Sequence, residues 1–167
     1  MEPLLITANV GIGPFKLGMR IEEVYKIEDY PAIDNSNEFN SVSGYFQEQF
    51  IKLEFDSNGS LRFIEISKPD PTDAQVCLFN GMDIFRTKVD DLIPKIDKIT
   101  PYDRNDFELG CSYIFRELNI CFWRPTIITE ADLTSEDFLK MSTENQELEK
   151  RYFYFTTISI HAPGYYT

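Results

Sequence analysis

The chain has 167 residues, a length that suits one domain with a sizeable hydrophobic core. It contains 28 acidic and 16 basic residues, which give a formal net charge of −12. A surface of this sign repels nucleic acid and anionic lipid, so we expect neither a nucleic-acid nor a membrane partner and favour a basic protein. Solubility alone also accounts for an acidic surface, and that reading stays open.

The first ten residues have neither a basic start nor an apolar run long enough for a signal peptide or a membrane span. We therefore expect a cytoplasmic protein. The three cysteines, Cys77, Cys111 and Cys121, have no metal-binding spacing and lie in apolar surroundings. We predict that they are buried free thiols.

The first expected element is a short strand over residues 4–10, which the glycines and the proline of residues 11–14 interrupt. A helix follows, because Ile21, Val24 and Tyr25 have the i, i+3, i+4 spacing of one buried helical face. Residues 30–43 contain several Asn and Ser residues and are predicted to form a loop.

A hairpin is the strongest local prediction in the first half. Residues 49–55 and 61–66 alternate apolar and polar side chains, as half-buried strands do. The turn between them contains the pair Asn58-Gly59, and such a pair tolerates positive φ at both central turn positions.

The second half of the chain starts after a joint at residues 68–72, where two prolines deny backbone donors to a continuing strand. A helix is then expected, with Thr87 and Asp90 as its capping pair and with Pro94 kinking or shortening it. Its buried face comprises Val89, Leu92, Ile93 and Ile96.

A second hairpin is predicted over residues 112–115 and 120–124. Residues 125–150 are an insertion relative to the first half, with a polar surface helix that Ser135 caps. The apolar residues of that helix are Phe138, Leu139 and Met141. Aromatic and β-branched residues over 152–161 predict a final strand.

A weak internal repeat relates the two halves. The stretch Gly13, Leu17, Ile21, Glu22, Glu23, Val24 returns as Gly81, Phe85, Val89, Asp90, Asp91, Leu92, and Ile158 and Ile160 match Ile64 and Ile66. We predict an α+β fold in which two related helix-plus-antiparallel-sheet halves, residues 1–68 and 75–167, form one compact domain over residues 1–167.

The sequence contains little that predicts catalysis. A single histidine, His161, excludes sites with several histidine ligands, and its place at a strand end is typical of a structural residue. The segment Gly11-Ile12-Gly13 lacks the third glycine of a dinucleotide fingerprint, and no Gly-Lys-Ser/Thr motif follows. We predict no catalytic residue, no metal and no cofactor.

Five carboxylates lie in predicted loops: Asp70, Asp73, Asp103, Asp106 and Glu108. Solvation of the loops is the plain explanation, and a catalytic acid and base would need two carboxylates about 5–10 Å apart. The third reading, which we adopt, is that they face a basic partner, because complementary charge speeds association and aromatic anchors supply affinity. The candidate anchors, each of which could equally be core, are Tyr45, Tyr102, Tyr113 and Trp123.

The pattern of residues 11–24, Gly-Ile-Gly-Pro-Phe-Lys-Leu-Gly-Met-Arg-Ile-Glu-Glu-Val, resembles the helix-start motif of small tandem α+β proteins, including the beta-lactamase-inhibitor-protein-like group. Residues 120–125, together with the ending Gly164-Tyr165-Tyr166, are similar to bacterial proteins of toxin-immunity loci. The resemblance implies a tandem helix-plus-sheet body that presents a sheet face or loops to a protein partner. Arg20 departs from it, since it occupies the place of a Ser or Thr helix cap.

Three functions are therefore carried forward. The first is a non-catalytic inhibitor, a bacterial immunity protein whose acidic surface neutralises a basic toxin domain such as a nuclease. The second is a small enzyme or ligand-binding domain with a pocket between helix and sheet, where loop carboxylates act as acid and base. The third is a homo-oligomer that pairs through exposed aromatic residues, and the sequence leaves the oligomeric state open.

Overall fold

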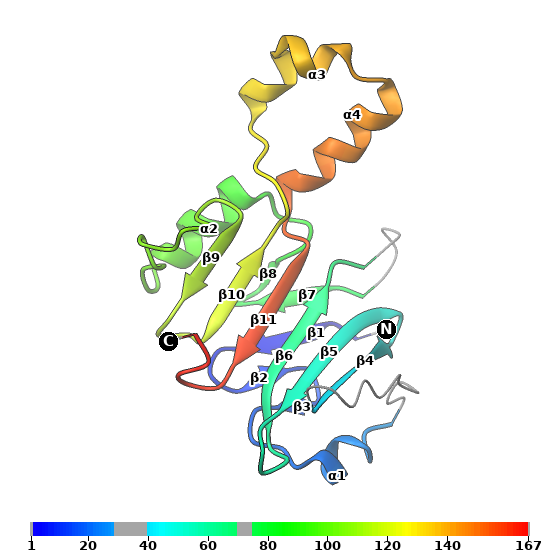
Figure 1. The fold of residues 1–167 in the computed structure, drawn as a ribbon, viewed down its shortest axis with the longest axis vertical. Coiled ribbons are helices and arrows are strands. Elements are labelled where there is room, and N and C mark those ends of the chain that lie inside the picture. Colours follow the sequence, from blue (N-terminus) through cyan, green and yellow to red (C-terminus); the bar gives the residue numbers. More distant parts are fainter. Residues whose placement is uncertain (1, 29–39, 70–74, 167) are drawn as a thin grey trace.

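The structure is a computed structural model that describes residues 2–28, 40–69 and 75–166. Two sheets, in which antiparallel pairing prevails, and a few helices make up the fold, which confirms the predicted α+β class. Figure 1 shows the smaller sheet behind the larger one and a helical segment that projects from one end of the molecule.

The smaller sheet has five strands in the order β3-β2-β1-β7-β8. These strands are β1 (Leu4–Thr7), β2 (Gly11–Ile12), β3 (Phe15–Lys16), β7 (Cys77–Phe79) and β8 (Met82–Asp83). β1 and β7 pair in parallel, with Ile6 opposite Phe79, so the first strand of each half meets its counterpart. The sequence does not predict β2, β3 or β8, because strands of two residues carry no periodic signal.

The larger sheet has six antiparallel strands in the order β4-β5-β6-β11-β10-β9. These strands are β4 (Ser41–Phe46), β5 (Gln49–Phe55), β6 (Leu61–Ser67), β9 (Ser112–Phe115), β10 (Ile120–Trp123) and β11 (Thr157–His161). The last strands of the two halves pair at its centre, with Ile64 opposite Ile160 and Ile66 opposite Ile158. Each half therefore contributes three adjacent strands to this sheet.

Both predicted hairpins are confirmed, as β5–β6 and β9–β10. The β5–β6 turn differs from the prediction, because Gly59 has a φ of +75° while Asn58 does not take a positive φ. Instead, the Asp56 carboxylate accepts the backbone N–H groups of Asn58 and Ser60 at 2.8 and 3.0 Å. The Gly59 backbone N–H also donates to the Asp56 carbonyl at 2.9 Å, so the backbone and the Asp56 side chain close this turn together.

The predicted loop of residues 30–43 is wrong where it can be compared with the structure. Residues 29–39 lie outside the described part of the chain, and residues 41–43 belong to β4. The joint predicted at residues 68–72 also lies largely outside the described residues.

The helices of the two halves differ in length. α1 (Ile21–Val24) is a single turn with Arg20 at its N-cap, where the Glu23 carboxylate accepts the Arg20 backbone N–H at 2.7 Å. α2 (Val89–Asp97) runs past Pro94 and buries the four predicted residues. The predicted Thr87–Asp90 capping pair is wrong, because Lys88 is the N-cap and the Thr87 hydroxyl donates to the Asp83 carbonyl.

The insertion between β10 and β11 contains η1 (Glu130–Thr134), α3 (Glu136–Lys140), α4 (Thr143–Lys150) and η2 (Arg151–Phe153). Ser135 caps α3 as predicted, since its hydroxyl accepts the Phe138 backbone N–H at 3.2 Å, although Met141 lies just beyond the helix. A small cluster of Ile128, Phe138 and Phe153, separate from the main core, holds the insertion together. η2 occupies the predicted start of the final strand, which begins at Thr157.

The main core lies between the two sheets and beneath α2. Alternate residues of the larger sheet, among them Ile64, Phe122 and Ile160, point inward and are fully buried there. The opposite face of this sheet points away from the smaller sheet and carries the intervening residues of the same strands. Of the three cysteines, Cys77 and Cys121 are buried as predicted, whereas Cys111 is half-buried.

Candidate functional site

The outer face of the larger sheet has a floor of small side chains. In the strand register, Cys121 lies opposite Ser159, and Ser159 lies opposite Glu65, so these three side chains form one row across β10, β11 and β6. Trp123 and Thr157 form the next row, two residues along the same strands. Because alternate residues share a face, both rows point to the same side of the sheet.

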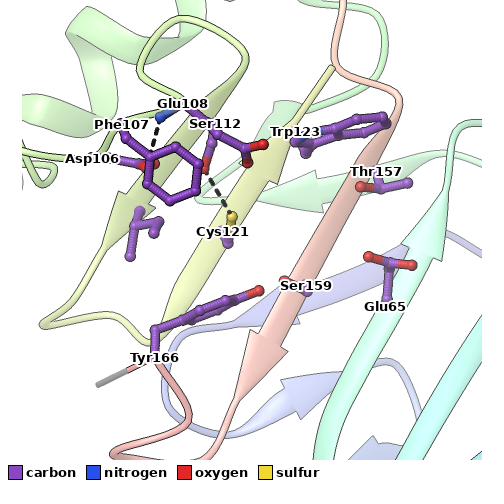
Figure 2. Close-up of a pocket in the computed structure, with 11 residues that line it drawn as sticks. Glu65, Asp106, Phe107, Glu108, Ser112, Cys121, Trp123, Thr157, Ser159 and Tyr166 are labelled. Atoms are coloured by element: carbon purple, nitrogen blue, oxygen red, sulfur yellow. Dashed lines mark hydrogen bonds between the residues drawn. The ribbon is translucent and has the colours of Figure 1, made fainter. Parts of the chain in front are cut away.

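A depression of about 440 Å³ lies over this floor. The loop between α2 and β9 forms one wall with Asp106, Phe107 and Glu108, and Tyr166 at the end of the chain forms another. Figure 2 shows Trp123 and Tyr166 at opposite ends of the depression, with Glu65 on one side and the loop acids on the other. Phe107 is 95 % exposed, although its side chain is large and apolar.

Hydrogen bonds fix the shape of the acidic loop. Asp103 pairs with Arg116 at 2.6 Å and also accepts the Asn105 backbone N–H. One oxygen of Asp106, Oδ1, accepts the Glu108 backbone N–H at 3.0 Å. The loop therefore holds its acidic side chains in a defined position above the sheet.

Gly110 and Arg124 fix the far end of this loop. Gly110 has a φ of +99°, which L side chains rarely adopt, and a Cβ atom there would also displace the end of the Ile127 side chain, 2.5 Å away, so this position favours glycine. Arg124 is 2 % exposed and donates to the carbonyls of Gly110 and Tyr152 at 2.9 and 2.8 Å. Burial lowers the pKa of this guanidinium. Arg124 thus joins the loop to the base of the insertion.

The C-terminal residues are held against the same face. Arg116 donates to the Tyr166 carbonyl at 2.9 Å, and the Tyr166 ring lies edge-on to His161, with ring centres 4.6 Å apart. Tyr165 stacks on Phe63 and donates its hydroxyl to Glu54 at 2.7 Å. Burial raises the pKa values of both tyrosines, so they are neutral donors and acceptors near neutral pH.

The floor of the depression lies in a negative electrostatic potential. Burial raises the pKa of Glu65 above its ordinary value. Burial is also the main reason why the pKa of the Cys121 thiol rises to about 11, and the negative charges of Asp106 and Glu65 both add to this rise. Cys121 is therefore a neutral thiol, not an activated nucleophile, and it lies within the field of carboxylates on both sides.

Two acceptors at this site have spare capacity. Within the described residues, Oδ2 of Asp106 is buried and has no hydrogen-bond donor. The Glu65 carboxylate takes part in none of the hydrogen bonds or ion pairs among residues 2–28, 40–69 and 75–166. The Glu65 carboxylate can therefore accept a donor from a ligand, whereas Oδ2 of Asp106 is an unsatisfied acceptor that is shielded from solvent.

The structure brings together two of the five acids predicted as partner-binding, Asp106 and Glu108. Asp103 belongs to the same loop, but its carboxylate is occupied by Arg116. Asp70 and Asp73 lie outside the described residues. Glu65 was not predicted, although an acid between Ile64 and Ile66 in an alternating strand is a signal for an outward-facing charge.

Among the candidate aromatic anchors, only Trp123 lines the depression. Tyr102 and Tyr113 pack against each other, with ring centres 5.0 Å apart, and against the main core. Tyr45 is 65 % exposed but lies on the edge strand β4, against Phe50. Phe107 is the exposed aromatic residue at the depression that the sequence did not predict, because a lone aromatic residue between two acids gives no periodic signal.

Other chemistry finds little support among the described residues. No group of three or more His, Cys, Asp or Glu side chains in them is arranged to hold a metal ion. His161 is 3 % exposed, and burial lowers its pKa. None of the helices in the described ranges has the length and apolar character needed to cross a membrane.

Comparisons of the chain with protein-family models, with curated proteins and with solved structures gave no match.

Proposed function

We propose that this protein is a non-catalytic inhibitor that binds a basic protein through the outer face of its larger sheet. The observation that carries the proposal is the depression over β10, β11 and β6, where three carboxylates and three aromatic side chains surround a floor of small residues. The resemblance of its sequence to toxin-immunity proteins makes a bacterial toxin domain, such as a nuclease, the first partner to test.

The net charge of the molecule supports a basic partner. A nuclease must present positive charge to hold phosphate, and a chain with a charge of −12 attracts such a surface over long range. Steering of this kind accelerates association and weakens as salt increases. Occluding the basic surface of the partner is sufficient for inhibition, so the proposal needs no catalytic residue.

Affinity would come mainly from the aromatic side chains. Phe107 is almost completely exposed and Trp123 is 36 % exposed at the rim of the same depression. Interface hot spots are enriched in aromatic residues that become desolvated on binding, while charges at the rim contribute more to association rate than to affinity.

A small-molecule site is the second candidate, because a volume of about 440 Å³ is within the range of ligand pockets. The depression lies on the sheet face away from α2, however, not between helix and sheet. Its thiol is protonated near neutral pH and is hydrogen-bonded to Ser112 at 3.6 Å. These features favour binding over nucleophilic catalysis.

The test is binding to a basic bacterial toxin domain of nuclease type, sought first among the products of neighbouring genes, measured by calorimetry at low and high salt and by protection of the nuclease substrate from cleavage. We expect Asp106→Lys with Glu108→Lys to abolish protection, and Phe107→Ala to weaken binding by at least tenfold. Glu144→Lys, an exposed acid on α4, is the matched control and should bind as the wild type does.

Equal losses in the loop variants and in the Glu144→Lys control would overturn the proposed surface. Absence of binding, combined with a small molecule that raises the melting temperature and is displaced by Phe107→Ala, would replace the inhibitor with the ligand-binding alternative.

A further inference from the structure

We propose that the depression on the outer sheet face receives one arginine side chain of the partner, with its guanidinium above Cys121 and Ser159, between Glu65 and the loop acids. This inference rests on the proposed function, because it names the chemical group that the same surface recognises. It adds a specificity for arginine over lysine, which a general acidic surface would not have.

The position follows from the strand register. Cys121, Ser159 and Glu65 lie opposite one another on three adjacent strands, which are spaced about 4.8 Å apart. Asp106 approaches the same floor from the loop side. The negative charges of Asp106 and Glu65 both act on the Cys121 thiol and contribute to its raised pKa. A cation above this sulfur therefore lies between two carboxylates, where their attractions add.

The hydrogen-bonding groups suit a ligand with several donors. Oδ2 of Asp106 has no donor among the described residues, and the Glu65 carboxylate accepts no hydrogen bond there, although the charge of Lys52 on the neighbouring strand acts on it. Thr157 adds a hydroxyl oxygen on the same floor, in the row of Trp123. A guanidinium has five N–H donors in a fixed plane, whereas an ammonium has three donors around one point.

The aromatic side chains select a planar cation. Trp123 and Tyr166 stand at opposite ends of the depression, and Phe107 lies beside it (Figure 2). A guanidinium stacks on aromatic faces and loses less hydration than an ammonium does on entering such a site. A phosphate or carboxylate ligand is disfavoured here, since every charged side chain that lines the depression is acidic.

The chain contains a built-in reporter for this inference, because Trp123 is its only tryptophan and lines the depression. The experiment titrates the full chain with three capped tripeptides, Gly-Arg-Gly, Gly-Lys-Gly and Gly-citrulline-Gly, and follows tryptophan fluorescence. Citrulline has nearly the shape of arginine without its charge. We expect a saturable change with the arginine peptide, at least fivefold weaker binding of the lysine peptide, and no saturable change with citrulline.

Two variants test whether the fluorescence change comes from binding at this depression. Glu65→Gln keeps the side-chain shape and should weaken binding of the arginine peptide about tenfold, the usual effect of losing a hydrogen bond to a charged group. Glu144→Gln, on the insertion, should leave it unchanged. Thermal unfolding of each variant confirms that it is folded before the titration is interpreted.

Equal responses to arginine and citrulline, no saturable response to arginine, or an unchanged affinity in Glu65→Gln would each overturn the inference. These results differ from failure of the proposed function. If the arginine peptide does not bind, but the loop variants still fail to bind the toxin domain, only the arginine site is wrong. If the arginine peptide binds and no basic protein domain does, only the inhibitor proposal is wrong.

Discussion

At the scale of single residues, Glu65 and Glu54 lie on the same sheet face but have pKa values shifted in opposite directions, so their removal should change stability in opposite directions. Burial raises the pKa of Glu65 above its ordinary value of 4.5. Its ionisation therefore costs more in the folded than in the unfolded chain; this cost is small below pH 4.5, grows as the pH rises from 4.5 to the folded-state pKa, and is constant above that pKa. We expect Glu65→Gln to be more stable than the wild type at pH 7 and equally stable at pH 4, measured by urea unfolding.

Glu54 provides the matched control for this pH dependence. Burial raises the pKa of Glu54, but hydrogen bonds from Lys52 and Tyr165 outweigh it and lower the pKa below its ordinary value. Glu54→Gln should therefore be less stable than the wild type at pH 7, and the difference should shrink as the pH falls through the folded-state pKa. If Glu65→Gln were destabilised at pH 7 as Glu54→Gln is, the burial argument for Glu65 would be wrong. A gain in stability that accompanies weaker arginine binding would mark Glu65 as a residue kept for recognition.

Arg124 supports a second prediction at this scale. Its guanidinium is buried and donates to the Gly110 and Tyr152 carbonyls, so Arg124→Ala leaves two carbonyls without their donors and opens a void. We expect the free energy of unfolding to fall by about 3 kcal/mol, measured by urea unfolding.

Lys140→Ala is the control, because Lys140 forms an exposed ion pair with Glu136 within α3, and such pairs contribute about 0.5 kcal/mol or less. A loss in Arg124→Ala no larger than that of Lys140→Ala would contradict the role assigned to Arg124.

At the scale of elements, the insertion between β10 and β11 should unfold on its own. Its cluster of Ile128, Phe138 and Phe153 is separate from the main core, and Phe138 packs within that cluster. Phe138→Ala should therefore speed hydrogen exchange over residues 130–150 while β6, β10 and β11 keep their protection. Exchange measured by mass spectrometry resolves these segments.

Phe122→Ala gives the contrasting result that this prediction requires. Phe122 is fully buried in the main core, so its truncation should destabilise the whole molecule by about 3–5 kcal/mol and speed exchange in both sheets. The separate cluster would be refuted by faster exchange throughout the molecule in Phe138→Ala.

At the scale of the whole molecule, both sheets cross the boundary between the two halves. β1 pairs with β7 in one sheet, and β6 pairs with β11 in the other, where the four paired isoleucines are fully buried. Neither half can complete a sheet without the other. We expect the two halves to unfold together, with coincident urea transitions for Trp123 fluorescence and far-UV circular dichroism.

Separate expression provides the control for this cooperativity. Residues 1–68 alone would leave the long edge of β6 unpaired, so we expect no cooperative transition from that segment. Two resolved transitions in the full chain, or a folded isolated half, would contradict the prediction.

The parts of the fold that local chemistry specifies could be predicted from the sequence. The β5–β6 and β9–β10 hairpins follow from alternation and short turns, and the buried face of α2 follows from helical spacing. Local signals failed at the β5–β6 turn, where only Gly59 and not Asn58 takes a positive φ, and where strands were too short to alternate, as at β2 and β3. The separate helix α4 was not predicted because its side chains are almost entirely polar and show no apolar periodicity.

By itself the sequence determined the α+β class, the acidic charge and the presence of loop acids at Asp106 and Glu108, since these depend on composition and on neighbours along the chain. Only the tertiary structure decided which groups meet. Glu65, Trp123 and Tyr166 come from three distant segments, and the pairing of β6 with β11 places them around one floor with the loop acids. Strand order across a sheet depends on which apolar faces bury one another, and no local pattern encodes that choice.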